Sequence, residues 1–311
     1  MHLNNLAKMS RPGHILIGGG TGFIGTTLCK QLKSKGYGIT VISRMPGVNR
    51  LSWGELQDKG LPKGTTAVVN LAGQNVMDFS RRWTAGFKQN VFFSRVNTTK
   101  TLAGLIDNAT CKPEVFVTIS GVGIYKPDSE KEYTEESQVT PFDFFSDLCN
   151  QWEKAAHFEK PDSQKQCRIV TIRSGVVLGR DGGMIKQMYL PFYLGLGGPV
   201  GTGCQYMPWI HLNDLTNLII YSIETPKVHG VLNGVAPNPC TNMEFTKAFG
   251  KALSRPTLFP VPSFVLNCLL NKERAVMITE GQKVLPKKTL STGFKYQYPD
   301  IESACREVVS K

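Results

Sequence analysis

The segment from His14 to Gly25 constrains the fold more than any other, because a short aliphatic run leads directly into a cluster of glycines. These glycines fit the spacing G-x-G-x-x-G from Gly20 and, equally well, the spacing G-x-x-G-x-x-G from Gly19. Both spacings are typical of a strand, a tight turn and a helix whose N-terminus binds the pyrophosphate of a dinucleotide. The residues predicted to bind the nucleotide here are Gly19, Thr21, Gly22, Phe23, Ile24 and Gly25.

The residues on either side of the glycines decide between this interpretation and an ordinary glycine-rich loop. Residues 15–17 are aliphatic and start a predicted strand. Residues 26–35 are rich in helix formers and are followed by Gly36, which is suited to a helix C-terminus. A strand before the glycines and a helix after them favour the nucleotide site.

The composition is that of a globular α/β protein. The chain has 311 residues, of which 41% are hydrophobic, so it can bury one large domain or a main domain with a smaller one. No run of about 20 apolar residues is free of charges and helix breakers, so we expect no membrane span. The eight cysteines are scattered without a C-x-x-C pair, so we expect reduced, mostly buried thiols and no metal site.

The net charge of +12 favours anionic ligands, a class that includes a phosphorylated cofactor, nucleic acid and acidic membrane surfaces. Lysine and arginine are dispersed, and the densest pair, Lys287-Lys288, is too short for a polybasic tract. We therefore expect a solvated basic surface and no specific nucleic-acid partner. Residues 1–13 contain no apolar signal region, so we expect an intracellular protein, cytoplasmic or mitochondrial.

The end of the second predicted strand, residues 39–42, indicates which dinucleotide is bound. NAD-binding proteins place an Asp or Glu about here for the ribose 2′-hydroxyl, but this chain has Ser43 and Arg44. Arg44, assisted by Ser43 and Arg50, can form charge-assisted hydrogen bonds with a 2′-phosphate. The sequence therefore predicts NADP(H) as the cofactor, the alternative being that Arg44 is a solvated surface residue.

Strand and helix patterns alternate five times along the first half of the chain, which predicts a doubly wound parallel sheet. The third strand, residues 66–71, ends in small residues that let a nucleotide lie close to the backbone. The predicted cofactor-binding residues there are Asn70, Leu71, Ala72 and Gly73. The next predicted elements are a helix over 81–107 broken only by Gly86 and Gly104, a strand over 115–119, a helix over 142–158 and a strand over 168–172.

After about residue 179 the pattern changes to Gly- and Pro-rich turns, and this region is expected to fold over the ligand edge of the sheet. Its predicted elements are a strand over 231–233 and helices over 242–253 and 299–309. We therefore expect an α/β protein with a Rossmann domain over 14–178. A smaller C-terminal substrate-type region is expected over 179–311, with some segments returning to the Rossmann sheet.

These motifs, taken in order, resemble the extended, epimerase-like branch of the short-chain dehydrogenase/reductase superfamily over nearly the whole chain. The matching segments are residues 19–25, 70–73 and 209–215. The resemblance implies a Rossmann fold, NADP(H)-dependent redox or epimerase chemistry, and a Tyr-x-x-x-Lys pair that transfers a proton and binds ribose. It also implies that Ser120, at the end of the fourth predicted strand, hydrogen-bonds a substrate carbonyl.

The expected Tyr-x-x-x-Lys pair is missing from this chain. Counting back from Glu153, which resembles the usual glutamate of this helix, puts Phe145 at the tyrosine position and Cys149 at the lysine position. Phenylalanine has no proton to transfer, and cysteine supplies no fixed cation. Tyr125, in the loop after Ser120, could replace the lost donor. A tyrosine at this loop position, however, often accompanies the true catalytic tyrosine in the branch.

Four other polar residues are candidates for a role in the site or have a structural role. Arg173, at the end of the fifth strand, is a candidate for contacting cofactor or substrate anions, and Ser94 is a candidate for facing the cofactor from the long helix. His211 lies in an apolar run and fits a hydrogen-bonded structural histidine better than a base. Asp214 opens the following helix, where the helix dipole favours a carboxylate without any catalytic role.

The sequence leaves two main classes of function. The first is an NADP(H)-dependent oxidoreductase or epimerase-like enzyme that acts on an unknown small molecule with a non-standard proton donor. The second is a non-catalytic NADP(H)-binding sensor or interaction protein, which Phe145 and Cys149 favour. Nucleic-acid binding rests on charge alone and ranks last. The sequence does not determine the oligomeric state, and a homo-oligomer is one of the possibilities.

Overall fold

Parallel strands form a central seven-stranded sheet in the computed structural model, which describes residues 13–45, 47–78 and 81–310. The strand order is β10-β7-β5-β4-β1-β2-β3, which is the doubly wound arrangement, so the predicted fold class is confirmed. The strands are β1 (His14–Gly18), β2 (Gly38–Ile42), β3 (Arg50–Leu51), β4 (Thr65–Asn70), β5 (Val115–Gly121), β7 (Arg168–Ser174) and β10 (Gly230–Gly234). Because all seven are parallel, their carboxyl ends lie along one edge.

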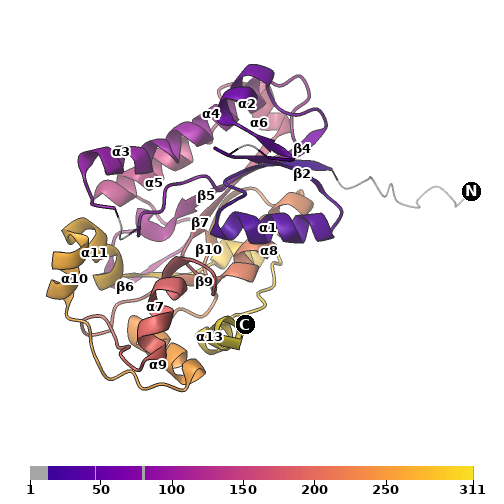
Figure 1. Cartoon of the computed structure of the whole chain (residues 1–311). Helices are drawn as coiled ribbons and strands as arrows, with labels where there is room; N and C mark the ends of the chain where they lie inside the picture. The colour runs from indigo at the N-terminus through magenta and orange to yellow at the C-terminus, as the bar shows by residue number, and fades with distance from the viewer. Residues whose placement is uncertain (1–12, 46, 79–80, 311) are drawn as a thin grey trace, which may run out of the picture.

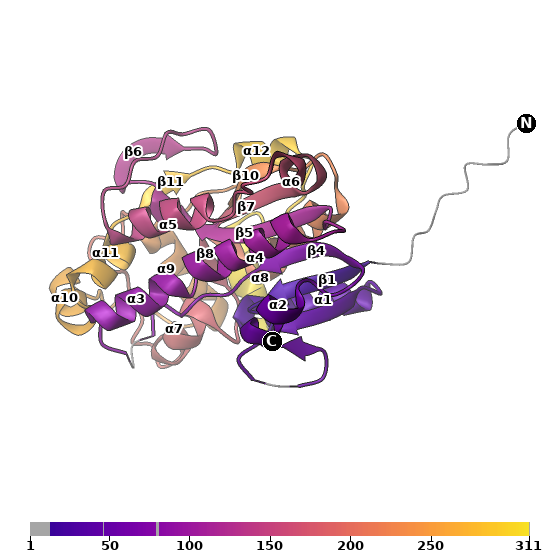
Figure 2. The ribbon, with the colours of Figure 1, turned by 90° about the horizontal axis from the view of Figure 1, so that it is seen from above.

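Helices cover both faces of this sheet (Figures 1 and 2). On one face α1 (Phe23–Ser34) contacts α8 (Leu212–Glu224), and on the other α4 (Val96–Asn108) contacts α5 (Phe144–Lys154). Strand β1 shows why the two cores form, since successive side chains of a strand point to opposite faces. Ile15 and Ile17 pack in the core under α1 and α8, whereas Leu16 packs with residues of α4. The short helices α2 (Trp53–Lys59) and α6 (Pro161–Gln166) complete this part.

The helix predicted over residues 81–107 is interrupted at a different place from the one predicted. The structure has two helices, α3 (Ala85–Phe93) and α4, and the chain bends between them at Ser94 and Arg95. The two glycines that were expected to interrupt the helix lie inside α3 and α4 instead. A helix-interior glycine costs only about 1 kcal/mol relative to alanine, which tertiary packing readily offsets.

The second half of the chain adds a helical layer and two small parallel sheets beside the carboxyl edge of the main sheet (Figure 1). Helices α7 (Gly183–Tyr193), α9 (Asn242–Leu253) and α13 (Ile301–Ser310) share one hydrophobic core with the sheet of β8 (Val176–Leu178) and β9 (Trp209–His211). The other small sheet pairs β6 (Asp128–Tyr133) with β11 (Gln282–Val284). The remaining elements are η1 (Val122–Ile124), α10 (Ser263–Leu270), α11 (Lys272–Thr279) and α12 (Lys287–Ser291).

His211 and Asp214 tie the C-terminal segment to the start of α8. The buried His211 ring accepts a hydrogen bond from the Asn213 backbone at Nδ1, and its Nε2 lies 2.8 Å from Glu307 Oε2. The buried carboxylate of Asp214 accepts hydrogen bonds from the backbone N–H groups of residues 297 and 298, at 2.7 and 2.9 Å. Both side chains therefore have structural roles, as their sequence context indicated.

No helix in residues 13–45, 47–78 and 81–310 is long and apolar enough to span a bilayer. All eight cysteines are free thiols. Three of them are exposed, namely Cys111, Cys204 and Cys268, and four are buried, namely Cys149, Cys167, Cys240 and Cys305. Burial raises the pKa of Cys149 to about 11 and that of Cys167 to about 12, so these thiols stay protonated and unreactive near neutral pH.

This difference predicts the order of thiol modification. In the native protein at mildly alkaline pH, iodoacetamide is expected to label the three exposed cysteines first, while the four buried ones react only on unfolding. Peptide mass spectrometry over a time course measures this order, and labelling in denaturant, where all eight should react alike, is the control. Labelling of Cys149 as fast as Cys111 would contradict the structure.

Candidate functional site

The turn between β1 and α1 has a backbone that requires its glycines. Gly19 has a φ of +74°, and a β-carbon there would lie 2.6 Å from the carbonyl oxygen of Leu71. Gly25 is packed so tightly that a β-carbon would lie 2.3 Å from Gly19 O and 2.6 Å from Gly20 Cα. These contacts press the turn against the end of β4 and the helix against the turn, as the sequence predicts.

The first turn of α1 is open to an anion. Gly22 is the N-cap residue and offers no capping side chain, and the first turn contains no acidic residue. Thr21 and Gly22 are exposed, so the N-terminal N–H groups at Phe23 and Ile24 lie beside an accessible surface. An uncapped helix start with exposed glycine backbone binds phosphate well, because the unsatisfied N–H groups and the helix dipole both favour negative charge.

The side chain of Phe23 has a separate role from its backbone. A β-carbon on Gly182 would lie 2.4 Å from Phe23 Cδ2, and one on Gly179 would lie 2.8 Å from its Cζ. The ring therefore packs against the segment that leads into α7. This contact joins the glycine turn to the C-terminal part of the chain.

Arg44 is placed beside the glycine turn by the sheet register. Gly18 pairs with Ile42, so the residues that follow each strand lie next to one another at the carboxyl edge. Ser43 is buried and its Oγ accepts a hydrogen bond from the Met45 backbone, whereas the Arg44 side chain is exposed and forms no ion pair with a described residue. The cation is therefore available to a ligand, and Ser43 shapes the backbone that presents it.

The segment after β4 is shaped by Asn70. Its buried Oδ1 accepts a hydrogen bond from Ala72 N at 3.1 Å, and its Nδ2 donates to Thr99 Oγ1 at 2.8 Å. Leu71 N donates to Gly18 O at 2.8 Å, which fixes the segment to β1. Gly73, the last residue of the predicted motif, is exposed. Asn70 therefore holds the turn, and Ala72 and Gly73 present backbone at the carboxyl edge.

Ser94 is a positioning residue in this structure. Its Oγ accepts a hydrogen bond from Gln74 N at 2.9 Å and donates to Val91 O at 3.0 Å. The first of these bonds holds the segment after Gly73 against the end of α3, and the second fixes the hydroxyl to the last turn of that helix. The hydroxyl proton is thus already used, which argues against the direct cofactor contact predicted for Ser94.

The two positions that the sequence assigns to the acid–base pair, Phe145 and Cys149, are buried. Phe145 stacks on Trp83 with ring centroids 5.5 Å apart, so an aromatic cluster covers the place of the expected tyrosine. Cys149 lies beside Ser120 and Gly121. Its pKa is raised mainly by burial and further by Glu153, so the thiol is neutral. The buried hydroxyl of Ser120 has the Cys149 thiol beside it and forms no other hydrogen bond with the described residues.

Tyr125 and Arg173 lie in a buried network away from open surface. Arg173 donates to both carboxylate oxygens of Glu153 at 2.8 Å and to the Tyr125 hydroxyl at 2.9 Å. That hydroxyl also lies 2.9 Å from Asn233 Oδ1 and 3.0 Å from Thr134 O. A phenol has one proton, which these acceptors already engage. The geometry therefore argues against a catalytic Tyr125 and against Arg173 as an anion-binding residue.

The structure places three further residues around the predicted site, and the sequence motifs did not indicate them. These residues are Arg95, Trp83 and Trp152. Arg95 lies with its guanidinium against Gly73 and 5.3 Å from the Trp152 ring centroid. Trp152 in turn donates from Nε1 to the Thr99 hydroxyl at 2.9 Å. These contacts join residues that are far apart in the chain, and the sequence gives no local signal for them.

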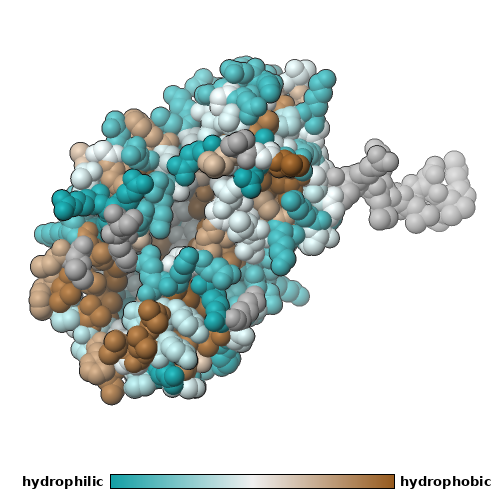
Figure 3. Space-filling view, in the orientation of Figure 1, coloured by the Kyte–Doolittle hydropathy of each residue, from teal (hydrophilic) through white to brown (hydrophobic). Residues whose placement is uncertain are grey.

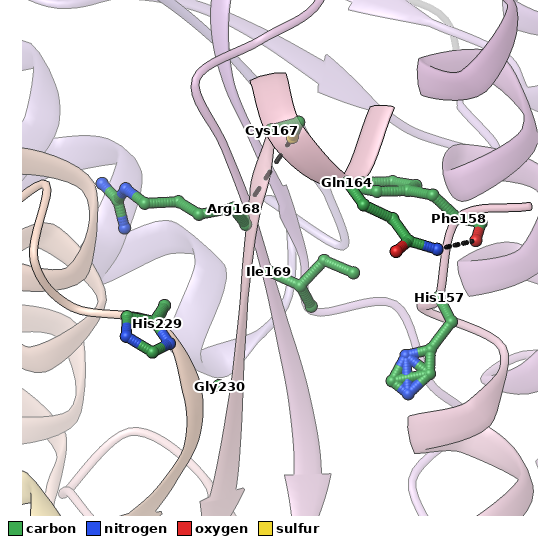
Figure 4. A pocket seen from close by; sticks show the side chains of 8 residues that line it. All are labelled: His157, Phe158, Gln164, Cys167, Arg168, Ile169, His229 and Gly230. Carbon is green, nitrogen blue, oxygen red and sulfur yellow. Dashed lines mark hydrogen bonds between the residues drawn. The ribbon is translucent and has the colours of Figure 1, made fainter. Parts of the chain in front are cut away.

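The surface is hollowed over the region where β5 and β7 end (Figures 1 and 3). A different hollow, of about 500 Å³, lies at the opposite edge, where Arg168 and Gly230 begin β7 and β10 (Figure 4). The guanidinium of Arg168 there donates to the carbonyl oxygens of residues 223 and 228, so it serves packing. Ligands of doubly wound sheets bind at the carboxyl edge, and the candidate site is therefore the one beside the glycine turn.

The glycine turn, the uncapped helix start and the small residues after β4 together define a dinucleotide-binding α/β protein. Residues 15–233 match the NAD dependent epimerase/dehydratase family, and residues 261–308 match a domain of unknown function, DUF1731. The chain belongs to the NAD dependent epimerase/dehydratase family. This confirms the resemblance to the epimerase-like branch.

Relatives of known name match nearly the whole chain. Epimerase family protein SDR39U1 of Bos taurus is 49% identical over 297 residues, covering 95% of this chain and 99% of the relative. A chloroplastic SDR39U1 homolog of Arabidopsis thaliana is 36% identical over 310 residues, covering 95% and 86%. The crystal structure of human epimerase family protein SDR39U1 (isoform 2) with NADPH superposes with a TM-score of 0.93, at 46% identity, covering 96% and 99%.

Proposed function

We propose that this protein binds NADP(H) at the carboxyl edge of its sheet and acts as an oxidoreductase or epimerase-like protein on a small molecule. The observation that carries the proposal is the glycine turn, where a β-carbon at Gly19 or Gly25 would collide with backbone while the adjoining helix start is uncapped and exposed. The crystal structure of the human relative with NADPH supports the same cofactor. When bound, NADP(H) supplies or accepts a hydride.

The side chains of this protein would then bind and orient rather than exchange protons through the usual pair. Arg44 holds the 2′-phosphate, the α1 start holds the pyrophosphate, and Ala72 and Gly73 form the floor beneath the nucleotide. Phe145 cannot transfer a proton, and burial keeps Cys149 protonated. Ser120 is a polar group near the end of β5, and its hydroxyl, which has only the Cys149 thiol beside it among the described residues, is suited to hydrogen-bond a carbonyl that reaches it.

Replacing Arg44 with aspartate tests the cofactor preference. The variant is expected to bind NADPH about 100-fold more weakly, because it loses charge-assisted hydrogen bonds and adds repulsion, while NADH binding changes little. Isothermal titration with both cofactors measures the two dissociation constants. Lys63→Asp makes the same change of charge on an exposed residue ahead of β4, at the opposite edge, and serves as the control. Equal weakening of NADPH and NADH by Arg44→Asp would contradict the proposed 2′-phosphate site.

A second candidate function is a non-catalytic NADP(H)-binding sensor or interaction protein. The packing of Phe145 under Trp83 and the fully engaged Tyr125 hydroxyl favour it, because both deprive the site of a proton donor. Following NADPH absorbance against a panel of carbonyl compounds separates the candidates. Turnover that is lost in Ser120→Ala supports the enzyme, whereas tight NADPH binding without turnover of any compound supports the sensor.

We further propose that residues 179–311 form the substrate side of the site and that the protein works inside the cell. The contact of Phe23 with Gly179 and Gly182 supports the first point, since it joins the C-terminal part to the glycine turn. The eight free cysteines support the second, because cysteines stay reduced in intracellular compartments. One relative carries the description chloroplastic, so location can differ among family members.

A further inference from the structure

Arg95 is a cation at the carboxyl edge that neither the sequence motifs nor the proposed cofactor contacts use. It lies where the chain bends between α3 and α4. A β-carbon built on Gly73 would lie 3.1 Å from Arg95 Cζ and 3.3 Å from both terminal nitrogens, so the glycine leaves room for the guanidinium. On its other side the guanidinium faces the Trp152 ring and is close enough to Cys149 to interact electrostatically with it.

This guanidinium is half-buried and has few hydrogen-bond partners. Its hydrogen bond within the described chain is from Nη1 to Val91 O at 3.2 Å, and none of the described carboxylates pairs with it. Burial lowers the pKa of Arg95 to about 10, which leaves it charged at neutral pH. Arg173, by contrast, is buried and has a carboxylate partner, because its Nη2 donates a hydrogen bond to Glu153 Oε2 at 2.8 Å. Arginine has five N–H donors, so most of those on Arg95 are free for a ligand.

The strand order indicates which part of a ligand reaches Arg95. Arg44 follows β2, the phosphate-binding turn follows β1, and Gly73 follows β4, while Ser120 lies one residue before the end of β5. These strands are adjacent in the order β2-β1-β4-β5. A dinucleotide with its 2′-phosphate at Arg44 and its pyrophosphate at the turn therefore extends across β4 toward β5. The nicotinamide half lies on that side, where Arg95 borders the exposed Gly73.

We propose that Arg95 binds the nicotinamide half of NADP(H), its guanidinium donating hydrogen bonds to the oxygens of the ribose on that side. Arg95, at the α3–α4 bend, then supplies the positive charge that the family lysine would supply. Cys149, at the expected lysine position, has no charge. This assignment rests on the proposed function, because it requires the dinucleotide to occupy the carboxyl edge. It adds a residue that fixes the reacting half of the cofactor.

The experiment compares two ligands that share the adenosine half. Arg95→Met removes the charge and keeps the length of the side chain, Arg95→Lys keeps a charge, and Lys100→Met removes an exposed charge from the same helix as the control. Dissociation constants are measured by titration calorimetry for NADPH, for NADP⁺ and for adenosine 2′,5′-bisphosphate, which lacks the nicotinamide half. Circular dichroism and urea unfolding check that each variant is folded.

The expected result is that Arg95→Met weakens NADPH and NADP⁺ about 10-fold or more and leaves adenosine 2′,5′-bisphosphate unchanged, with a smaller loss in Arg95→Lys. Unchanged NADPH binding overturns the proposal, because Arg95 then makes no contact that contributes to cofactor binding. Equal weakening of all three ligands also overturns it and assigns Arg95 to support of the turn. If Arg95→Met does not fold, the same comparison in Arg95→Lys decides. Failure of the wild-type protein to bind any of the three ligands overturns the proposed function itself.

Discussion

Replacing Gly25 with alanine is expected to abolish NADPH binding, with a loss of at least about 100-fold in affinity. The added methyl group would lie 2.3 Å from Gly19 O and 2.6 Å from Gly20 Cα, which are backbone atoms that cannot rotate away. The start of α1 must then move off the turn, and the N–H groups that receive the pyrophosphate lose their alignment. Overpacking of this kind also costs about 1–3 kcal/mol of folding free energy.

Titration of the variant with NADPH measures the loss, and urea unfolding measures the stability. Gly104→Ala is the matched control, because Gly104 lies inside α4 with no atom within 4 Å of an added β-carbon. That substitution is expected to stabilise the protein by about 0.5–1 kcal/mol, through better helix propensity, and to leave NADPH binding unchanged. Wild-type affinity in Gly25→Ala would show that the turn does not hold the phosphates.

Replacing Glu153 with glutamine is expected to lower the free energy of unfolding by about 3–5 kcal/mol. The reason is that Arg173, whose side chain is 6% exposed, loses the carboxylate to which it donates two hydrogen bonds of 2.8 Å. A buried guanidinium without an anion carries an uncompensated desolvation penalty. The Tyr125 hydroxyl, which accepts a bond from Arg173, also loses part of its network. Urea denaturation of both proteins gives the difference.

Two further variants show whether the pair itself is the cause. Glu302→Gln removes an exposed carboxylate 3.5 Å from Arg306 and should change stability little, since surface ion pairs contribute weakly. Combining Glu153→Leu with Arg173→Met removes both charges, so the double variant should be less destabilised than Glu153→Gln. A loss as small in Glu153→Gln as in Glu302→Gln would show that Arg173 finds another anion.

The sheet could be predicted from sequence because its signals are local. Each of the strands from β1 to β7 that the pattern identified is an aliphatic run followed by a small or polar residue at the carboxyl edge. Strand β3 has two residues, which is too short to show the alternation of apolar and polar side chains that marks a strand in a sequence. The break at Ser94 and Arg95 has no glycine or proline to mark it, and Ser94 is held there by a hydrogen bond from Gln74, 20 residues earlier, which helix propensity does not reveal.

The candidate site divides in the same way. The glycine turn and the Arg44 position follow from neighbours in sequence, and the structure places both at one edge. The network that engages Tyr125 could not be foreseen, because it joins Tyr125 to residues 48 and 108 positions further along the chain. The position of Arg95 could not be predicted for the same reason, since the contact that places it at the site is with Gly73, 22 residues earlier in the chain.

Titration of the unmodified protein with NADPH and with NADH, read by calorimetry and by thermal unfolding, shows whether this edge binds NADP(H). The structure predicts one NADPH site, a dissociation constant for NADH at least about 10-fold higher, and a stabilisation of about 2.7 kcal/mol at 100 times the NADPH dissociation constant. Absence of binding and of any stabilisation with either cofactor would show that this edge is not an NADP(H) site.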